Sequence, residues 1–325
     1  MKRSTQWMGA ALLVCGWAWS HAADAKEVTL KAVSAFAVGS SSVSEPFERF
    51  VKRVNEQGKG LVQIDLVGGP DAVPAFQQGN AVQSGVVDMA AVPGVFYTTV
   101  VPEAEALKMT RGTSQQLRDD GSLDLINEIW AEKGVYLLGR TWETVPFNIY
   151  LKKPLRDGSF KGVRLRATPN YRSFFAALGA VNVDMAPGEV YTALERGVVD
   201  GFGWMSTGLF DLGWDEHTRY RVEPAFYSAD LGLLFNLNKW QSLSDEQRQF
   251  LIEQAKWFEG LNAEQQTYME QELKRQADAG IEVIELTGEA RAAYEKASRE
   301  ASWEAIAKQA PKHAQRLREK FEAAR

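Results

Sequence analysis

The same short junction occurs twice in this chain, as AVQSGVVDMAAV at residues 81–92 and as ALERGVVDGFGW at residues 193–204. In each copy a segment of helical composition ends at a glycine, Gly85 or Gly197, and an apolar run follows. Both glycines are predicted helix caps, because glycine takes the left-handed conformation at little cost. A helix-to-strand junction repeated in this way predicts two α/β halves of similar build.

Strand and helix patterns alternate around both junctions, and this alternation predicts parallel α/β sheets. The expected strands are 27–36, 61–69, 86–92, 161–167, 181–186 and 198–204. The expected helices between them are 44–58, 75–85, 170–180 and 187–197.

Two helical stretches are expected at the C-terminal end. The capping-box pattern SDEQ at residues 244–247 opens a helical stretch that continues to about Ala279. A helix of this length measures roughly 50 Å, which is long enough to cross both halves, and Gly260 is a candidate bend. The tail, residues 299–325, is an expected amphipathic helix that packs on one lobe.

The first residues have the pattern of a secretory signal peptide. Lys2 and Arg3 precede a short apolar run at residues 7–19, and the cleavage-site pattern SHA follows. We expect residues 1–22 to be the signal peptide, with cleavage after Ala22 or, as an alternative, after Ala25. The protein is therefore expected in the periplasm.

The composition excludes several kinds of function. The formal net charge is −5 and no basic block is present, which argues against nucleic-acid binding. Cys15, the only cysteine, lies in the apolar run of the signal peptide, and a lipid anchor there is the less favoured interpretation. His217 and His313 are isolated, and no metal-ligand, nucleophile or phosphate-binding motif appears, so catalysis is not predicted.

Aromatic and basic residues lie near the expected strand ends, where parallel α/β sheets bind their ligands. Arg166 ends the strand 161–167, and Trp204 ends the strand that follows the second junction. The complete set of candidate ligand-binding residues is Arg166, Trp204, Phe147, Asn148, Arg140, Phe36, Phe96 and Asn170. Two alternatives stay open: the three phenylalanines could be core residues, and Arg166 could pair with a surface carboxylate.

One stretch, FKGVRLRATPN followed by FFAALGAVNVDMAPGEVYTALERGVVDG, lies within residues 160–201. It resembles the solute-binding subunits of tripartite ATP-independent periplasmic (TRAP) transporters, and the resemblance covers essentially all of the chain after the signal peptide. It implies an α/β, two-lobed periplasmic binding protein fold, with parallel-type sheets flanked by helices, hinge strands and a long helix crossing both lobes. Lobe I would comprise 26–147 with 232–273, and lobe II would comprise 148–231 with 274–325.

The resemblance also implies a function and its partners. A TRAP solute-binding protein captures an organic acid and delivers it to the membrane permease subunits, without catalysis and without a cofactor. We expect a monomer. An exported sensory binding protein or an enzyme on the same scaffold is the alternative.

The family holds the ligand carboxylate with an arginine, and Arg166 occupies that position. One branch has a Glu-Trp pair and uses a metal, whereas this chain has Gly203 before Trp204, so no metal is expected. Sialic-acid binders have a second arginine where this chain has Phe147, and Pro187 replaces a frequent aromatic residue. These departures favour a small monocarboxylate with an apolar or cyclic body.

A dicarboxylate remains an alternative ligand, because Arg140 or Arg172 could supply a second positive charge.

Overall fold

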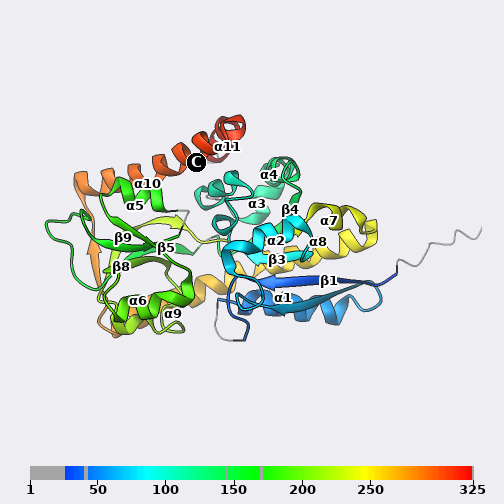
Figure 1. The fold of residues 1–325 in the computed structure, drawn as a ribbon, viewed down its shortest axis with the longest axis horizontal. Coiled ribbons are helices and arrows are strands. Elements are labelled where there is room, and N and C mark those ends of the chain that lie inside the picture. The colour runs from blue at the N-terminus through cyan, green and yellow to red at the C-terminus, as the bar shows by residue number, and fades with distance from the viewer. Residues whose placement is uncertain (1–25, 40–42, 111, 144, 169–170, 324–325) are drawn as a thin grey trace, which may run out of the picture.

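The computed structural model describes residues 26–323 except 40–42, 111, 144, 169 and 170. Two mixed β-sheets lie side by side along the molecule, each flanked by helices, and define a first and a second half (Figure 1). The expected two-lobed α/β fold is confirmed in this arrangement. The predicted signal peptide and Cys15 lie outside the described residues.

The first half contains a five-stranded sheet of order β2-β1-β3-β10-β4. Its strands are β1 (Val28–Ser34), β2 (Val62–Gly68), β3 (Met89–Val92), β4 (Val135–Thr141) and β10 (Leu231–Asn236). Its helical segments are α1 (Glu45–Gln57), η1 (Ala75–Gln77), α2 (Gln78–Ser84), η2 (Gly94–Phe96), η3 (Pro102–Met109), α3 (Ser114–Asp119), α4 (Ser122–Ala131) and α7 (Leu237–Ser242).

The second half contains a six-stranded sheet of order β11-β9-β5-β8-β6-β7. Its strands are β5 (Pro146–Leu151), β6 (Arg164–Ala167), β7 (Val181–Asp184), β8 (Gly201–Met205), β9 (Tyr220–Ser228) and β11 (Glu282–Glu285). Its helical segments are α5 (Arg172–Ala177), η4 (Pro187–Glu189), α6 (Val190–Glu195) and η5 (Trp214–His217).

The predicted parallel pairing holds within each half but not throughout the sheets. β1 is parallel to β2 and β3, and β6 is parallel to β7 and β8. In contrast, β10 is antiparallel to β3 and β4, and β5 is antiparallel to β8 and β9. β5 enters the second sheet from the first half, and β10 enters the first sheet from the second half. Each runs antiparallel to both strands that it pairs with.

The repeated junction has the same hydrogen bonds in both halves. Gly85 and Gly197 have φ of 77° and 65°, as expected for helix-ending glycines. The carboxylate of Asp88 accepts from the Lys31 amide at 2.8 Å. That of Asp200 accepts from the Arg164 amide at 3.0 Å. Each aspartate therefore binds the amide of the residue just before the first paired position, which is Ala32 with Met89 in one half and Leu165 with Gly201 in the other. The repeated sequence thus marks where a parallel strand pair begins.

A pair of helices forms the expected long helical crossing. α8 (Asp245–Gly260) and α9 (Asn262–Asp278) are separated only by Leu261. The Leu261 amide donates to the Phe258 carbonyl, three residues earlier, at 3.2 Å. This turn is tighter than a turn of α-helix, in which the acceptor lies four residues earlier, and the helix is interrupted there. The expected long helix is thus interrupted one residue after Gly260, the candidate bend. α8 packs on β4 and α1 of the first half, and the Gly208 amide of the second half donates to Glu272 of α9 at 3.2 Å.

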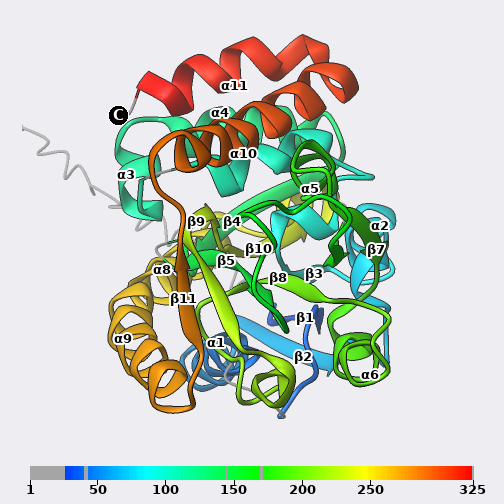
Figure 2. The same cartoon turned by 90° about the vertical axis from the view of Figure 1, so that its left-hand side faces the viewer.

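The C-terminal tail differs from the single helix on one lobe that we expected. It forms α10 (Gly288–Gln309) and α11 (Pro311–Ala323), because Pro311 excludes Ala310 from helical geometry. α10 contacts α5 and β9 of the second half and η3 of the first, while α11 contacts η3 and α4. The two helices lie along one side of the molecule (Figure 2) and extend from the second half towards the first (Figure 1).

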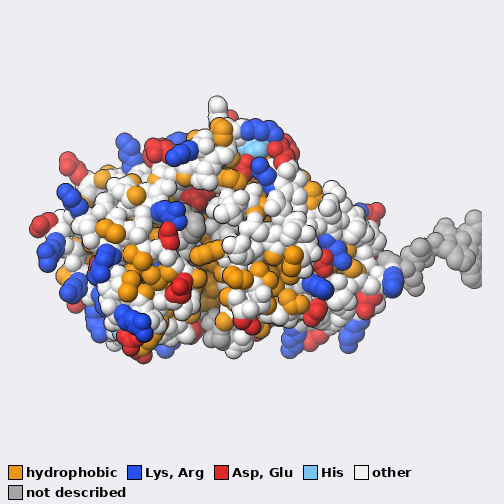
Figure 3. Space-filling model, in the orientation of Figure 1, with side chains coloured by type: hydrophobic (Ala, Val, Ile, Leu, Met, Phe, Trp, Pro, Cys, Tyr) orange, Lys and Arg blue, Asp and Glu red, His pale blue; other side chains and the backbone are white. Residues whose placement is uncertain are grey.

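The largest hydrophobic core continues from the first half into the second. Phe36, after β1, packs edge-on against Trp204 of β8, with ring centroids 6.3 Å apart. On the surface, hydrophobic side chains gather near the middle of the molecule, between the charged ends (Figure 3). Within the described residues, no helix has both the length and the apolar character needed to cross a membrane.

Candidate functional site

A cavity of about 40 Å³ lies where the two halves meet. Both halves and both strand connections between them contribute to its wall. The lining residues are Phe36, Pro93, Val95, Phe96, Lys108, Trp142, Phe147, Arg166, Thr168, Tyr171, Trp204, Met205, Tyr227, Ser228, Ala229 and Asp230. This wall is mostly apolar and aromatic, with a few convergent polar groups, which is the usual composition of a small-molecule site.

Arg166 is fully buried near the carboxyl end of β6, and three of its neighbours fix its guanidinium. Its Nε donates to the Met185 carbonyl at 3.1 Å, and Nη1 donates to the Tyr171 hydroxyl at 2.7 Å. That hydroxyl donates in turn to the Gly203 carbonyl at 3.1 Å. The face of Trp204 lies 5.8 Å from the guanidinium carbon, within cation–π range. The side chain is therefore held in one orientation.

The guanidinium of Arg166 lacks a compensating anion within the described residues. Its Nη2 has no hydrogen-bond partner there, and no carboxylate forms an ion pair with it. Burial lowers the pKa of Arg166, while the Tyr171 hydroxyl and the distant Glu189 and Asp184 carboxylates act against that shift. An arginine stays charged under such conditions, so the cavity presents a desolvated cation with a free donor. A carboxylate is the group that best supplies both a negative charge for this cation and a hydrogen-bond acceptor for Nη2.

Aromatic rings surround this charge. The Phe147 ring lies 5.7 Å from Tyr171 and 6.3 Å from Trp204, measured between centroids. Phe36 lies 6.2 Å from Phe96 on the other side of the cavity. Phe36, Phe96, Phe147 and Trp204 were all predicted as ligand residues, and the structure places all of them at the cavity together with Arg166.

The cavity residues with polar atoms that were not predicted from the sequence include Trp142 and Asp230, which lie on the connections between the halves, and Lys108. Trp142 lies between β4 and β5, Asp230 lies between β9 and β10, and both are buried. Lys108, at the end of η3, forms an ion pair with Glu105 and lies 4.1 Å above the Tyr227 ring. Burial lowers the pKa of Lys108, and Glu105 opposes that change.

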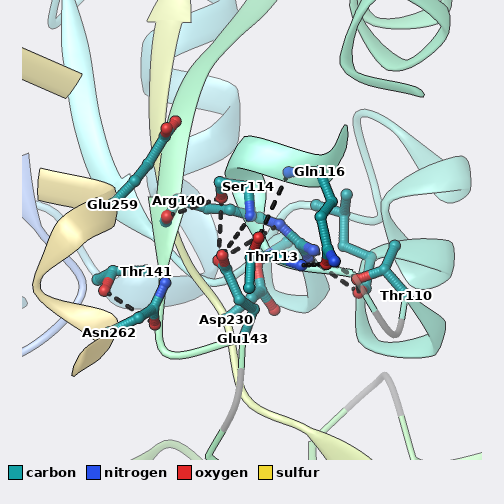
Figure 4. A network of polar contacts seen from close by, with 12 residues as sticks. Thr110, Thr113, Ser114, Gln116, Arg140, Thr141, Glu143, Asp230, Glu259 and Asn262 are labelled. Atoms are coloured by element: carbon teal, nitrogen blue, oxygen red, sulfur yellow. Dashed lines mark hydrogen bonds and ion pairs between the residues drawn. The ribbon is translucent and has the colours of Figure 1, made fainter. Parts of the chain in front are cut away.

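Arg140 and Asn148, two further predicted ligand residues, do not border the cavity. Arg140 is buried in the polar network of Figure 4, where Nη1 donates to the Leu107 carbonyl at 3.0 Å and Nη2 donates to Thr110. Its Nε lies 3.8 Å from Glu143. Asn148 is buried in β5 and bonds the Val222 carbonyl at 2.9 Å. Both side chains satisfy backbone groups near the strand connections.

The other arginines named from the sequence are surface residues. Arg164 pairs with Asp200 at 2.6 Å, and Arg172 pairs with Asp184 at 2.5 Å; all four side chains are more than 40% exposed. Asn170 lies outside the described residues.

The surroundings of Gly203 explain why this chain has no carboxylate there. A Cβ on Gly203 would lie 3.2 Å from the rings of Tyr171 and Phe175 and 3.3 Å from that of Phe226. The aromatic residues thus occupy the space that a glutamate would need. Within the described residues, no group of three or more His, Cys, Asp or Glu side chains could hold a metal ion.

Residues 34–309 match the sequence profile of the bacterial extracellular solute-binding proteins of family 7, the DctP family. The chain belongs to this family. A monocarboxylate 2-oxoacid-binding periplasmic protein of Nostoc sp. is 29% identical over 212 residues, which make up 61% of this chain and 57% of that protein.

Solved structures share the fold of this chain. A TRAP periplasmic solute-binding protein of Desulfovibrio salexigens with bound orotic acid superposes with a TM-score of 0.80 at 21% identity, covering 91% of this chain and 97% of that one. A Bordetella pertussis extracytoplasmic solute receptor binding pyroglutamic acid gives 0.78 at 18% identity, covering 91% and 99%. The expected family membership is confirmed, and this chain is a solute-binding protein of family 7. Solved TRAP solute-binding proteins share its fold.

Proposed function

We propose that this protein is a periplasmic receptor that captures a small monocarboxylate with an apolar or cyclic body and delivers it to TRAP membrane permease subunits. The observation that carries the proposal is the buried Arg166, whose Nη2 lacks a partner within the described residues, in an aromatic cavity. The mostly apolar and aromatic wall of the cavity favours an acid with an apolar or cyclic body. The relatives that bind 2-oxoacids, orotic acid and pyroglutamic acid support the same ligand class.

A thermal-shift screen against organic acids tests this function. A ligand present at about 100 times its Kd adds about 2.7 kcal/mol to the free energy of unfolding, which is easily measured. We expect small monocarboxylates to raise the melting temperature and their neutral amides to leave it unchanged. Stabilisation by sugars or amines, with none by any acid, would contradict the proposal.

Binding is expected to be independent of divalent metal. Gly203 stands where a metal-using branch of the family has a glutamate, and the rings around it fill that space. Titration calorimetry with the acid found in the screen should give the same Kd before and after EDTA treatment. Affinity that is lost in EDTA and restored by calcium would show that this position was misread.

We further propose that binding brings two lobes together, lobe I at 26–147 with 232–273 and lobe II at 148–231 with 274–325. The cavity wall comes from both, so a ligand there bridges them. Small-angle scattering should show a smaller radius of gyration with a saturating acid. An unchanged radius would argue against this motion.

A further inference from the structure

Two buried donors without a hydrogen-bond partner border the same cavity. Among the described residues that contain such atoms, only Arg166, through Nη2, and Trp142, through Nε1, line it. In the proposed function, the ligand carboxylate accepts from Arg166 Nη2. The indole N–H of Trp142 is a second, independent donor, because it comes from the connection between β4 and β5 and not from β6.

The backbone holds Trp142 in an unusual conformation. Its φ is +69°, in the left-handed region that residues other than glycine rarely adopt. The side chain is 2% exposed, and its ring packs 6.0 Å from that of Phe36. The Trp142 carbonyl accepts from the Val145 amide at 2.9 Å, which closes a tight turn. Backbone strain of this kind concentrates at functional sites, where the surrounding structure maintains it.

Asp230 provides an acceptor on the neighbouring connection. The Ala229 amide donates to the Val145 carbonyl at 2.8 Å, so the turn that contains Trp142 is tied directly to the residue before Asp230. One carboxylate oxygen, Oδ2, accepts from the Gly94 amide at 2.8 Å. Within the described residues, Asp230 forms no ion pair. Burial raises the pKa of Asp230, while Arg140, the Gly94 amide and Lys108 oppose that rise. Asp230 also lines the cavity.

We propose that Trp142 and Asp230 form a second recognition pole, which binds a neutral hydroxyl or amide group of the acid held by Arg166. Such a group accepts a hydrogen bond from the indole N–H and donates one to the carboxylate. A purely apolar substituent would leave the indole N–H unsatisfied, and a second carboxylate would lie beside the carboxyl group of Asp230. The proposed ligands are therefore monocarboxylates that also carry a hydroxyl or amide group. This inference rests on the proposed function.

Matched pairs of acids test the second pole. The pairs are lactate and propionate, mandelate and phenylacetate, and pyroglutamate and cyclopentanecarboxylate, with Kd measured by titration calorimetry. In every pair with measurable binding, we expect the hydroxyl or amide member to bind about 10- to 100-fold more tightly, since a buried donor left unpaired is costly. Equal affinity within those pairs would overturn the second pole and leave the proposed function standing.

Variants test whether Trp142 and Asp230 cause the preference within each pair of acids. Trp142→Phe removes the indole N–H and should reduce the preference within each pair about tenfold, while changing the affinity of the unsubstituted acid less than about threefold. Trp303→Phe is the matched control, because its buried Nε1 also lacks a partner within the described residues but lies away from the cavity. Asp230→Asn should increase the affinity for succinate.

A Trp142→Phe variant that weakens both members of each pair equally would show a packing role only. Absence of binding by every acid to the wild type would overturn the proposed function and the second pole together.

Discussion

Replacing Arg166 with alanine is expected to weaken binding of the native acid by about 30- to 5000-fold. The ligand carboxylate would lie buried without its cation, and truncating one partner of a buried charge pair costs on the order of 2–5 kcal/mol. Arg166→Lys should also weaken binding, because a lysine keeps the charge but not the planar fork that Met185 and Tyr171 orient. Calorimetric titration with the acid identified by the screen measures both effects.

Arg164→Ala is the control for this experiment. Arg164 lies two residues earlier in the same strand, but its guanidinium is on the surface and pairs with Asp200. Its loss should change affinity little. If Arg166→Ala folds normally and binds within about threefold of the wild type, Arg166 has a structural role and the proposed site is wrong.

Replacing Arg118 with methionine should lower the free energy of unfolding by about 3–5 kcal/mol, because it leaves a buried carboxylate unpaired. Arg118 of α3 binds Glu259 of α8 through Nε and Nη2, at distances of 2.6–3.2 Å, and Nη2 also donates to the Leu138 carbonyl at 2.6 Å. The Glu259 side chain is only 6% exposed. Urea denaturation at neutral pH measures the loss.

The same variant should show a characteristic pH dependence. Burial raises the pKa of Glu259 above its ordinary value of 4.5, and Arg118 opposes that rise. Without Arg118 the folded protein holds the proton more tightly than the unfolded chain. Stability then falls as pH rises from 4.5 through the raised pKa, so the deficit relative to wild type is largest at neutral pH and shrinks towards pH 4.5.

Arg316→Met provides the comparison, since the Arg316–Glu128 pair has the same 2.6 Å contact on the surface, where both side chains are more than half exposed. Exposed pairs contribute little, so its denaturation midpoint should stay close to that of the wild type. Equal losses in the two variants, or a deficit for Arg118→Met that does not change with pH, would show that burial of Glu259 is not the cause.

The sequence predicted those features that depend on local pattern. The alternation of strands and helices and the glycine caps follow from residues close together in the chain, and both are present. The helix expected to bend at Gly260 is interrupted at Leu261. The position of Arg166 near a strand end could also be predicted, because parallel strands present their carboxyl ends at one edge of a sheet. Pro311 could have predicted the break between α10 and α11 as well.

The polar groups on the connecting strands could not be predicted in the same way. Trp142 and Asp230 are far apart in sequence, and they share a cavity only because two chain crossings pair through Val145 and Ala229. Arg140 shows the converse, since its charge suggested a ligand residue but its Nη1 and Nη2 donate to Leu107 and Thr110 instead, away from the cavity. Which donors remain free depends on tertiary contacts that no local pattern contains.

The Nη2 of Arg166, which lacks a partner within the described residues, also bears on how a transporter would distinguish loaded receptors from empty ones. In the proposed role, the permease would recognise the shape in which the two lobes are together. An empty receptor that took this shape would bury the cation away from both water and a carboxylate, at a substantial cost in free energy. A bound acid removes that cost. In that role, the recognised shape would report occupancy, and empty receptors would compete poorly with loaded ones for the permease.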